Sequence, residues 1–227
     1  MFRGDHPELT RVMGQAKAAA RGLGHPRVGS EHLLLALAGH GMLSGVTAEG
    51  VREAVQLAAP LGAGIAADRE ALAPLGVDLD GLLDRLGPEG VDRPVRWERR
   101  PGAEQARRRC ARMVPPLGLD VQAAYGASLR LALARRERWH RPEHLAMALV
   151  ALDPGAGWVL RAVGVEASAV LAELARAFPP PRRNRALRVE RRIGRQARGG
   201  RLVRDYQRTT GRAASSGRSV VALIAGS

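Results

Sequence analysis

The feature of this sequence that most constrains its fold is an internal repeat. Residues 31–37 read EHLLLAL and residues 143–149 read EHLAMAL, so five of seven positions are identical at an offset of 112. An apolar stripe at helical spacing precedes the first copy, and most of it recurs at the same offset. Each unit therefore begins with an amphipathic helix, a short connector and a Glu-His helix. The repeat predicts two similar helical units that pack together, because neither buries enough apolar surface alone.

A second match lies downstream at a different offset. Residues 76–86 align with residues 164–174 at an offset of 88, so the first unit carries 24 additional residues, which we place between about 39 and 74. Within this insertion, helical patterns cover residues 47–58 and 67–72. Ser30 is suited to cap the first Glu-His helix, and Asp78 is suited to cap the helix that follows the insertion. The compact second unit predicts helices near residues 121–136, 142–152, 157–163 and 167–178.

The composition agrees with a helical fold. Hydrophobic residues make up 45% of the chain and aromatic residues only 3%, so the core must consist of Ala, Leu and Val, which favour helix packing over a β-sandwich. We predict an all-α fold of two pseudo-repeated four-helix units. The first unit covers residues 1–86, a Pro-, Gly- and Arg-rich linker covers 87–116 with one helix near 103–113, the second unit covers 117–178, and a tail covers 179–227.

The net charge of +14 is concentrated in the tail. Residues 2–178 contribute only +3, whereas residues 179–227 contribute +11 through 13 arginines. The tail begins with three prolines and is poor in apolar residues, which predicts disorder. Its arginines are able to bind nucleic-acid phosphates. Alternatively, they form a solvated polycation encouraged by codon usage, because Lys17 is the one lysine and the composition is typical of a GC-rich, bacterial genome.

Several function classes find no support in the residues. The single cysteine, Cys110, excludes an intrachain disulfide, and we interpret it as an incidental thiol. The start of the chain has no apolar signal core, and no stretch reaches the length of a membrane span, so we predict a cytoplasmic protein. No nucleotide-binding loop or nucleophile elbow is present, and we predict neither enzymatic activity nor a cofactor.

The motifs of both units, in this order, resemble the N-terminal domain of Clp-type AAA+ unfoldases over roughly residues 5–178. The matching segments are Leu23-Gly24-His25, Gly29-Ser30-Glu31-His32-Leu33-Leu34-Leu35, Leu75-Gly76-Val77-Asp78-Leu79, Pro142-Glu143-His144-Leu145 and Val163-Gly164-Val165-Glu166. The resemblance implies a stand-alone, ClpC-like module that binds proteins or peptides: Clp substrates, adaptors or components of the Clp protease. Without the ATPase modules, it implies a decoy or modulator of Clp proteolysis. The alternative function is nucleic-acid binding through the tail.

The resemblance also suggests a ligand site. In the ClpC branch, phosphoarginine is held by the Glu of the Glu-His motif and by a Thr near the start of the first helix. Glu31 and Glu143 match the acid, and the Thr positions fall on His6 and Gly118. We expect ligand contact near both acids, with His6 serving the first unit and Gly118 offering only backbone donors in the second. Alternatively, each acid is favoured simply because it stands in the first turn of a helix.

The histidines have a structural and a chemical interpretation. His140 and His144 have the i, i+4 spacing of a metal-binding pair, but no third ligand is evident, and Val28 stands at the position equivalent to His140. We therefore expect no metal site, and we expect His32 and His144 to be packing histidines with hydrogen-bonded rings.

Overall fold

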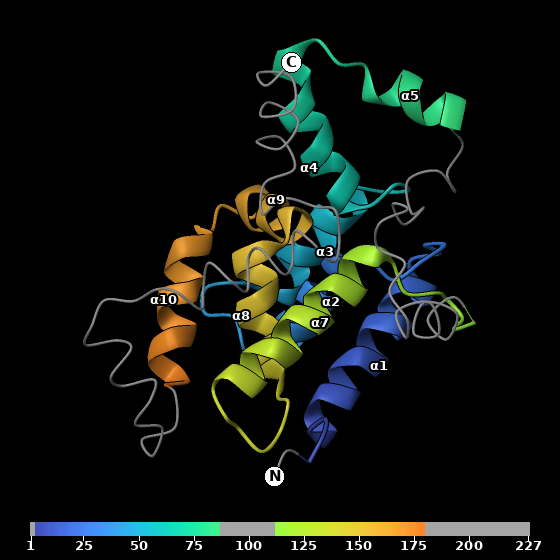
Figure 1. The fold of residues 1–227 in the computed structure, drawn as a ribbon. Helices are drawn as coiled ribbons and strands as arrows, with labels where there is room; N and C mark the ends of the chain where they lie inside the picture. Colours follow the sequence, from blue (N-terminus) through green and yellow to red (C-terminus); the bar gives the residue numbers. More distant parts are fainter. Residues whose placement is uncertain (1–2, 87–111, 180–227) are drawn as a thin grey trace.

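The computed structural model describes residues 3–86 and 112–179, and this part of the chain is all-helical, as the sequence predicts (Figure 1). Its elements are α1 (Pro7–Gly22), α2 (Ser30–Gly39), α3 (Ala48–Leu57), α4 (Ala63–Leu72), the 3-10 helix η1 (Ala73–Leu75), α5 (Leu79–Leu86), α7 (Leu119–Ala134), α8 (Pro142–Leu152), α9 (Pro154–Ala162) and α10 (Ala167–Ala177). No single helix described here is long and apolar enough to cross a membrane. Helices α8 and α9 reach the necessary length and apolar content only when taken together, and the chain bends by 85° between them.

The predicted helices of the second unit lie within three residues of the observed ones at every end, and Asp78 does cap α5, accepting the N–H of Gly81 at 3.0 Å. Two local predictions were wrong. Helix α4 begins at Ala63 rather than at residue 67, because Gly62, at φ +91°, turns the chain directly into the helix. At α2 the N-cap is Gly29, not Ser30, which is already helical.

Two isolated backbone bridges join the units, and they are related by the sequence repeat. In the first, the N–H of His6 donates to the carbonyl of His140 at 2.8 Å, and the N–H of His140 donates to Gly4 at 2.9 Å. In the second, the N–H of Gly118 donates to the carbonyl of Val28 at 2.9 Å, and the N–H of Val28 donates to Pro116 at 2.9 Å. Each residue of the first bridge differs by 112 from its counterpart in the second. The repeat offset is therefore a pseudo-two-fold relation in space.

The core forms around the two Glu-His helices. Helix α1 packs on α2, α7 packs on α8, and α2 touches α8. The apolar side chains of α2 and α8 are buried almost without interruption, and the largest fully buried leucines are Leu9, Leu33, Leu34, Leu37, Leu145, Leu149 and Leu160. This continuous burial explains why the Glu-His segments are the most similar part of the two units: both lie where any polar side chain would have to be paired.

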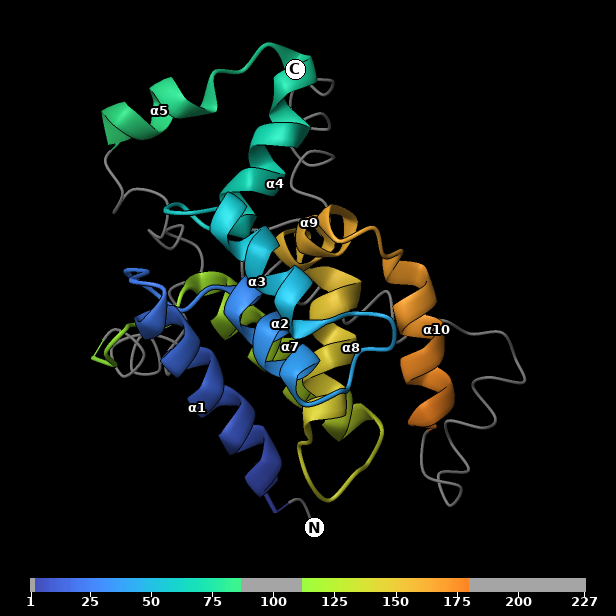
Figure 2. The ribbon, with the colours of Figure 1, turned by 180° about the vertical axis from the view of Figure 1, so that it is seen from behind.

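The closing helices of the units do not pack alike. Helix α10, which closes the second unit, lies against α8. In the first unit, the equivalent place against α2 is taken by α3, which comes from the insertion (Figure 2). Helix α5, the sequence match of α10, packs against α4, so α4, η1 and α5 form an arm, residues 63–86, that leads away from the body (Figure 1). The arm is anchored where α4 lies along α9, through Glu70, which accepts hydrogen bonds from Trp158 at 2.7 Å and Arg161 at 2.8 Å.

Most of the predicted linker, nearly all of the helix expected at 103–113, and the tail beyond residue 179 lie outside the described residues. The expected disorder of the tail therefore stays a prediction.

One helix cap crosses between the units and breaks the symmetry. The carboxylate of Asp120, near the start of α7, accepts the N–H of Ser30 at the start of α2 at 2.6 Å, and this contact is buried. The repeat-related residues are Glu8 and Pro142. Proline has no N–H to donate, and Glu8 is exposed. The cap therefore stabilises only the start of α2.

This asymmetry gives a matched pair of variants. We expect Asp120→Ala to lower the free energy of unfolding by about 2 kcal/mol, because it leaves a buried N–H without its charged acceptor. Glu8→Ala, the same change at the repeat-related position, should cost less than about 0.5 kcal/mol. Urea denaturation followed by circular dichroism measures both; equal losses would show that the cap is not the cause.

Candidate functional site

The two predicted acids lie in different environments. Glu31 is only 3% exposed. Its carboxylate packs on the backbone of Gly29 and Gly62, where an added Cβ would come within 2.3 Å and 3.1 Å of it. The connection between α3 and α4 therefore lies over this acid and leaves a shallow pocket beside it. Glu143 is partly exposed, and its Oε2 atom is buried with no hydrogen-bond partner among the described residues.

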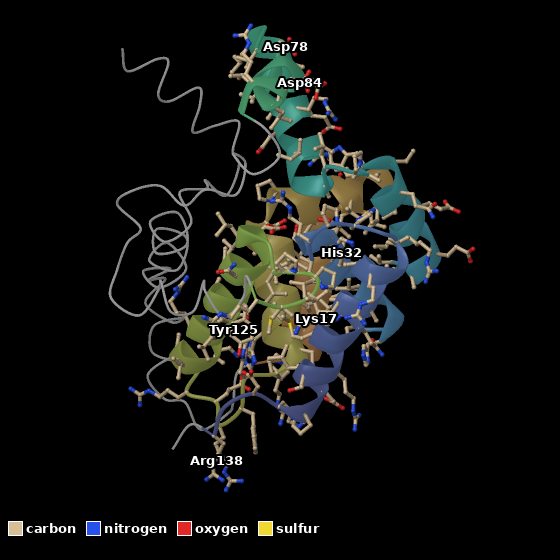
Figure 3. All side chains as sticks on the ribbon, turned by 90° about the vertical axis from the view of Figure 1, so that its right-hand side faces the viewer. Lys17, His32, Asp78, Asp84, Tyr125 and Arg138 are labelled. Carbon is tan, nitrogen blue, oxygen red and sulfur yellow. The ribbon has the colours of Figure 1, made fainter. Side chains whose placement is uncertain are left out.

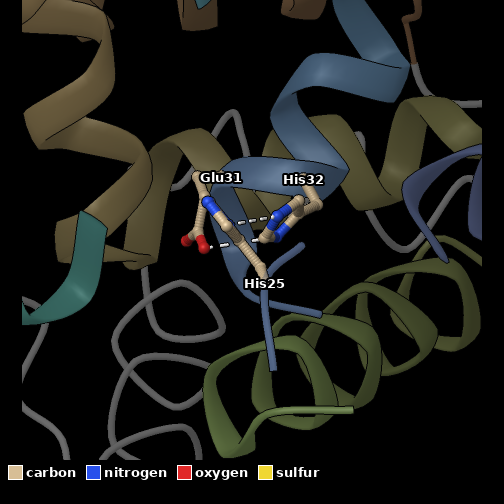
Figure 4. Close-up of side chains that lie close together, drawn as sticks. All are labelled: His25, Glu31 and His32. Atoms are coloured by element: carbon tan, nitrogen blue, oxygen red, sulfur yellow. Dashed lines mark hydrogen bonds and ion pairs between the residues drawn. The ribbon is translucent and has the colours of Figure 1, made fainter. Parts of the chain in front are cut away.

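His32, next to Glu31, uses both ring nitrogens. Its Nδ1 accepts the N–H of the N-cap residue Gly29 at 2.9 Å, so a neutral ring carries its proton on Nε2. Nε2 lies 2.9 Å from Nδ1 of His25 and donates to it (Figure 4). The Glu31 carboxylate, 3.2 Å from Nδ1, forms an ion pair with His32 only when that ring is doubly protonated. His32 is thus a packing histidine with a hydrogen-bonded ring, as predicted.

His144 repeats this arrangement with one change of partner. Its Nδ1 accepts the N–H of Arg141 at 3.0 Å, and its Nε2 lies 3.2 Å from the carboxylate of Glu137. Glu137 stands at the repeat position of His25. Burial alone would raise the pKa of Glu137, but the adjacent imidazole of His144 and the guanidinium of Arg135, whose Nε donates at 2.7 Å, lower it on balance. The second unit therefore holds an imidazole and a carboxylate where the first holds two imidazoles.

The structure pairs the four predicted ligand residues across the units. The backbone of His6 bonds to His140, three residues before Glu143, and the backbone of Gly118 bonds to Val28, three residues before Glu31. His6 therefore lies beside the second acid and Gly118 beside the first, opposite to the pairing we expected. The His6 ring accepts the N–H of Glu8 at 3.3 Å and meets Trp139 edge-on.

A side chain at position 118 would have no room. An added Cβ there would come 2.3 Å from the Asp120 carboxylate and 3.1 Å from the carbonyl of Val28. The carboxylate that caps α2 thus occupies the space of the hydroxyl that the resemblance implies. This explains the glycine and removes one phosphate donor from beside Glu31.

One group of described residues has the donor set of a metal site. His25, Glu31 and His32 each offer a ligand atom, all within 4.8 Å of one another. Two imidazoles and a carboxylate suit Zn²⁺, but an ion would have to displace the hydrogen bond between His25 and His32. The sequence pattern does not indicate this group, because His25 reaches His32 across the connector. Of the histidines at i, i+4 spacing, His140 is engaged elsewhere, since it bonds to Asp5 and Ser128.

The chain of contacts from Asp5 through His140 to Ser128 has the connectivity of a catalytic triad. Nδ1 of His140 lies 2.9 Å from Asp5, and Nε2 lies 2.7 Å from the Ser128 hydroxyl. However, His140 and Ser128 are fully buried, so no substrate reaches the hydroxyl. Asp5 also accepts from the Tyr125 hydroxyl at 2.5 Å, and burial together with this bond raises the pKa of Tyr125. The contacts hold the N-terminal segment against the second unit.

A larger apolar groove lies between α1 and α7, about 820 Å³ with its open mouth. Its lining is Asp5, Thr10, Met13, Lys17, Met113, Leu117, Val121, Gln122 and Tyr125. Met13, Met113 and Leu117 are partly exposed in it, and four of the nine lining residues, Asp5, Thr10, Lys17 and Tyr125, carry a charged or hydroxyl group. The sequence pattern does not predict this groove, because Met113 and Leu117 come from the expected linker and the start of the second unit.

Two helical units related by a pseudo-two-fold axis, each built around a buried Glu-His helix, define the Clp N-domain-like class of all-α folds. A solved structure of this class that the chain resembles is the N-terminal domain of the caseinolytic protease associated chaperone ClpD from Arabidopsis thaliana. The match has a TM-score of 0.50 and 18% sequence identity, and it covers 77% of this chain and 94% of that one. At this identity the likeness establishes the fold. No protein-family model matches the chain, and no curated protein matches its sequence.

The buried histidines predict a pH dependence of stability. Burial, followed by the neighbouring His32, lowers the pKa of His25, with Glu31 opposing. Burial also lowers the pKa of His140, and Asp5 offsets this only in part. A histidine with a lowered pKa binds fewer protons when folded than when unfolded. Its contribution to stability is complete above its unfolded pKa of about 6.5 and is lost as the pH falls below it.

We therefore expect the free energy of unfolding to fall between about pH 7 and pH 5, above the range in which carboxylates titrate. His25→Gln retains an acceptor for His32 and removes one titrating group, so it should flatten part of this slope. His40→Gln, at an exposed histidine, should leave the slope unchanged. Urea denaturation at several pH values measures all three proteins. A parent profile that is flat from pH 7 to pH 5 would contradict the prediction.

Proposed function

We propose that this protein is a non-enzymatic module that binds polypeptide segments in the groove between α1 and α7, in the context of Clp proteolysis. The observation that carries the proposal is the groove: a concave surface between the first helices of the two units, where Met13, Met113 and Leu117 lie together with polar and charged side chains. Ligand sites in proteins are typically concave and mostly apolar, with a few polar groups that fix orientation.

The lining chemistry favours flexible apolar segments over one fixed ligand. Met13 and Met113 present unbranched thioether side chains, which adapt to different partners, and the partly exposed Leu117 adds a further apolar side chain to the lining. Gln122 already donates to the carbonyl of Leu117 at 2.9 Å, so the groove is preformed on that side. Lys17, at the edge, would pair with an acidic group of the bound segment.

Binding of this kind needs no chemical step. Within residues 3–86 and 112–179, the one arrangement that resembles a catalytic triad is buried, and the Glu31 carboxylate is covered by Gly62. A module that captures unfolded segments, adaptors or Clp components without turning them over would act as a decoy or modulator of Clp proteolysis. This role rests on the resemblance of fold and motif and on the groove.

The test places a charge in the groove. Met13→Glu should weaken binding of fluorescein-labelled, unfolded casein by at least tenfold, because the acid must be desolvated against apolar surface. Leu57→Glu makes the same chemical change at a leucine that is 78% exposed on α3, and should alter the affinity by less than about twofold. Fluorescence anisotropy with the full chain measures both. Equal binding by parent and Met13→Glu would place the site elsewhere, and no binding by the parent would reject the proposed function.

The charge of residues 179–227, a net +11 over 49 residues, supports nucleic-acid binding as a second candidate function. If the tail carries it, the affinity for duplex DNA should fall steeply with salt and vanish when residues 180–227 are deleted, because the binding energy comes from released counterions. Electrophoretic mobility shifts at several salt concentrations measure this. Casein binding should survive the same deletion. DNA binding that persists in the shortened chain would place the nucleic-acid surface on the body.

A further inference from the structure

The arm, residues 63–86, is acidic on a body whose overall charge is slightly positive. It contains five acidic residues, Asp68, Glu70, Asp78, Asp80 and Asp84, against two arginines. Two of the acids are paired with arginines in the structure. Asp80 accepts two hydrogen bonds from Arg69, at 2.6 Å and 3.2 Å, and Glu70 forms an ion pair with Arg161 at 2.8 Å. Of the remaining acids, Asp68 is on α4, whereas Asp78 and Asp84 lie at the far end of the arm, where Arg85 offsets part of their charge (Figure 3).

The same end of the arm exposes leucines. Helix α5 packs on α4 through Leu83, which is 8% exposed, whereas Leu82 on the same helix is 43% exposed and Leu75 in η1 is 41% exposed. Asp78 and Leu82 are four residues apart at the start of α5 and so lie on one side of it. An exposed helix side that carries both acidic and apolar groups is a surface for a basic segment with interspersed aliphatic residues.

We propose that the arm is the docking surface for part of the chain's own basic tail, residues 192–204. This segment carries five arginines and no acid, and its apolar residues Ile193, Leu202 and Val203 stand singly or in a pair between the arginines. Arginine guanidinium groups pair with the carboxylates of Asp78 and Asp84, and an aliphatic side chain covers Leu82. Arginine suits such a surface because its planar fork forms two parallel hydrogen bonds with one carboxylate.

The length of the chain permits this contact. The described chain ends at residue 179, after α10. An extended segment covers up to about 3.5 Å per residue, and a compact domain of this size is roughly 40 Å across. Residues from about 192 onward are therefore long enough to reach the arm from the end of α10.

Hydrogen exchange of the α5 backbone amides in the full chain tests the proposal. At low salt, the double variant Asp78→Asn, Asp84→Asn should lose at least about tenfold of the protection of α5, because its attraction for the arginines is gone. Asparagine at position 78 still caps the helix, so the variant does not simply unwind α5. The matched control, Glu49→Gln, Glu53→Gln, removes the same charge from the exposed side of α3 and should leave α5 unchanged. At about 1 M salt, where charges are screened beyond roughly 3 Å, the α5 amides of parent and variant should exchange at the same rate.

Limited trypsin digestion gives a second measurement that does not depend on the stability of α5. Cleavage after the arginines of residues 192–204 should be several times slower in the parent than in the aspartate variant at low salt, and the control variant should be cleaved as slowly as the parent. Identical α5 exchange and identical tail cleavage in parent and variant would overturn the proposal. Protection that rises with protein concentration, together with a dimer in light scattering, would also overturn it, in favour of a second copy as the occupant.

Discussion

The two backbone bridges between the units are the constraint on which the rest of the structure depends. Each one joins the residue before a first helix, α1 or α7, to a residue two positions before the Glu-His helix of the other unit. Because peptide N–H and carbonyl groups pair only at fixed distance and direction, the starts of four helices are fixed together. The cap from Asp120 to α2 and the crossed pairing of His6 with the second acid both follow from this junction.

Close to this junction, one contact of the Glu-His histidine is the same in both units and another differs. The histidine of each Glu-His motif captures the N–H of the residue before its helix, through Nδ1 of His32 in one unit and His144 in the other. Because this contact is made to a backbone N–H, it does not depend on the neighbouring side chains. The group beside Nε2 can therefore differ between the units: it is the imidazole of His25 in the first and the carboxylate of Glu137 in the second. The histidine thus has a structural reason for its recurrence. The acid beside it has no such shared contact, since one copy is buried and the other partly exposed.

The insertion redistributes the surfaces available for binding. It supplies α3, which completes the packing around α2, and the connection that covers Glu31, so the acid predicted as a ligand group is enclosed by residues that the second unit lacks. It also displaces the sequence match of the closing helix onto an arm, where half-exposed leucines stand beside aspartates. The groove between α1 and α7 lies outside this rearrangement, because both helices belong to the parts that repeat and only Met113 of its lining comes from the linker. It is a concavity that the shared architecture leaves open.

The sequence by itself determined the helical class, the two units and the placement of the Glu-His helices. Apolar periodicity and the recurrence of the Glu-His motif at an offset of 112 can both be counted directly along the chain. It also indicated the capping role of Asp78, which acts within three residues of its own position. Only the tertiary structure decided which segments meet. The match of α5 with α10 did not predict that α3 would take the place against α2, since either helix offers an apolar side of similar length. Nor did the residues around Glu31 reveal its burial, which is imposed by Gly62, 31 positions away. Burial and pairing depend on contacts between distant segments. A repeat in the sequence gives the order of its units along the chain. That His6 and Gly118 each bond to the other unit follows only when the two units pack against each other.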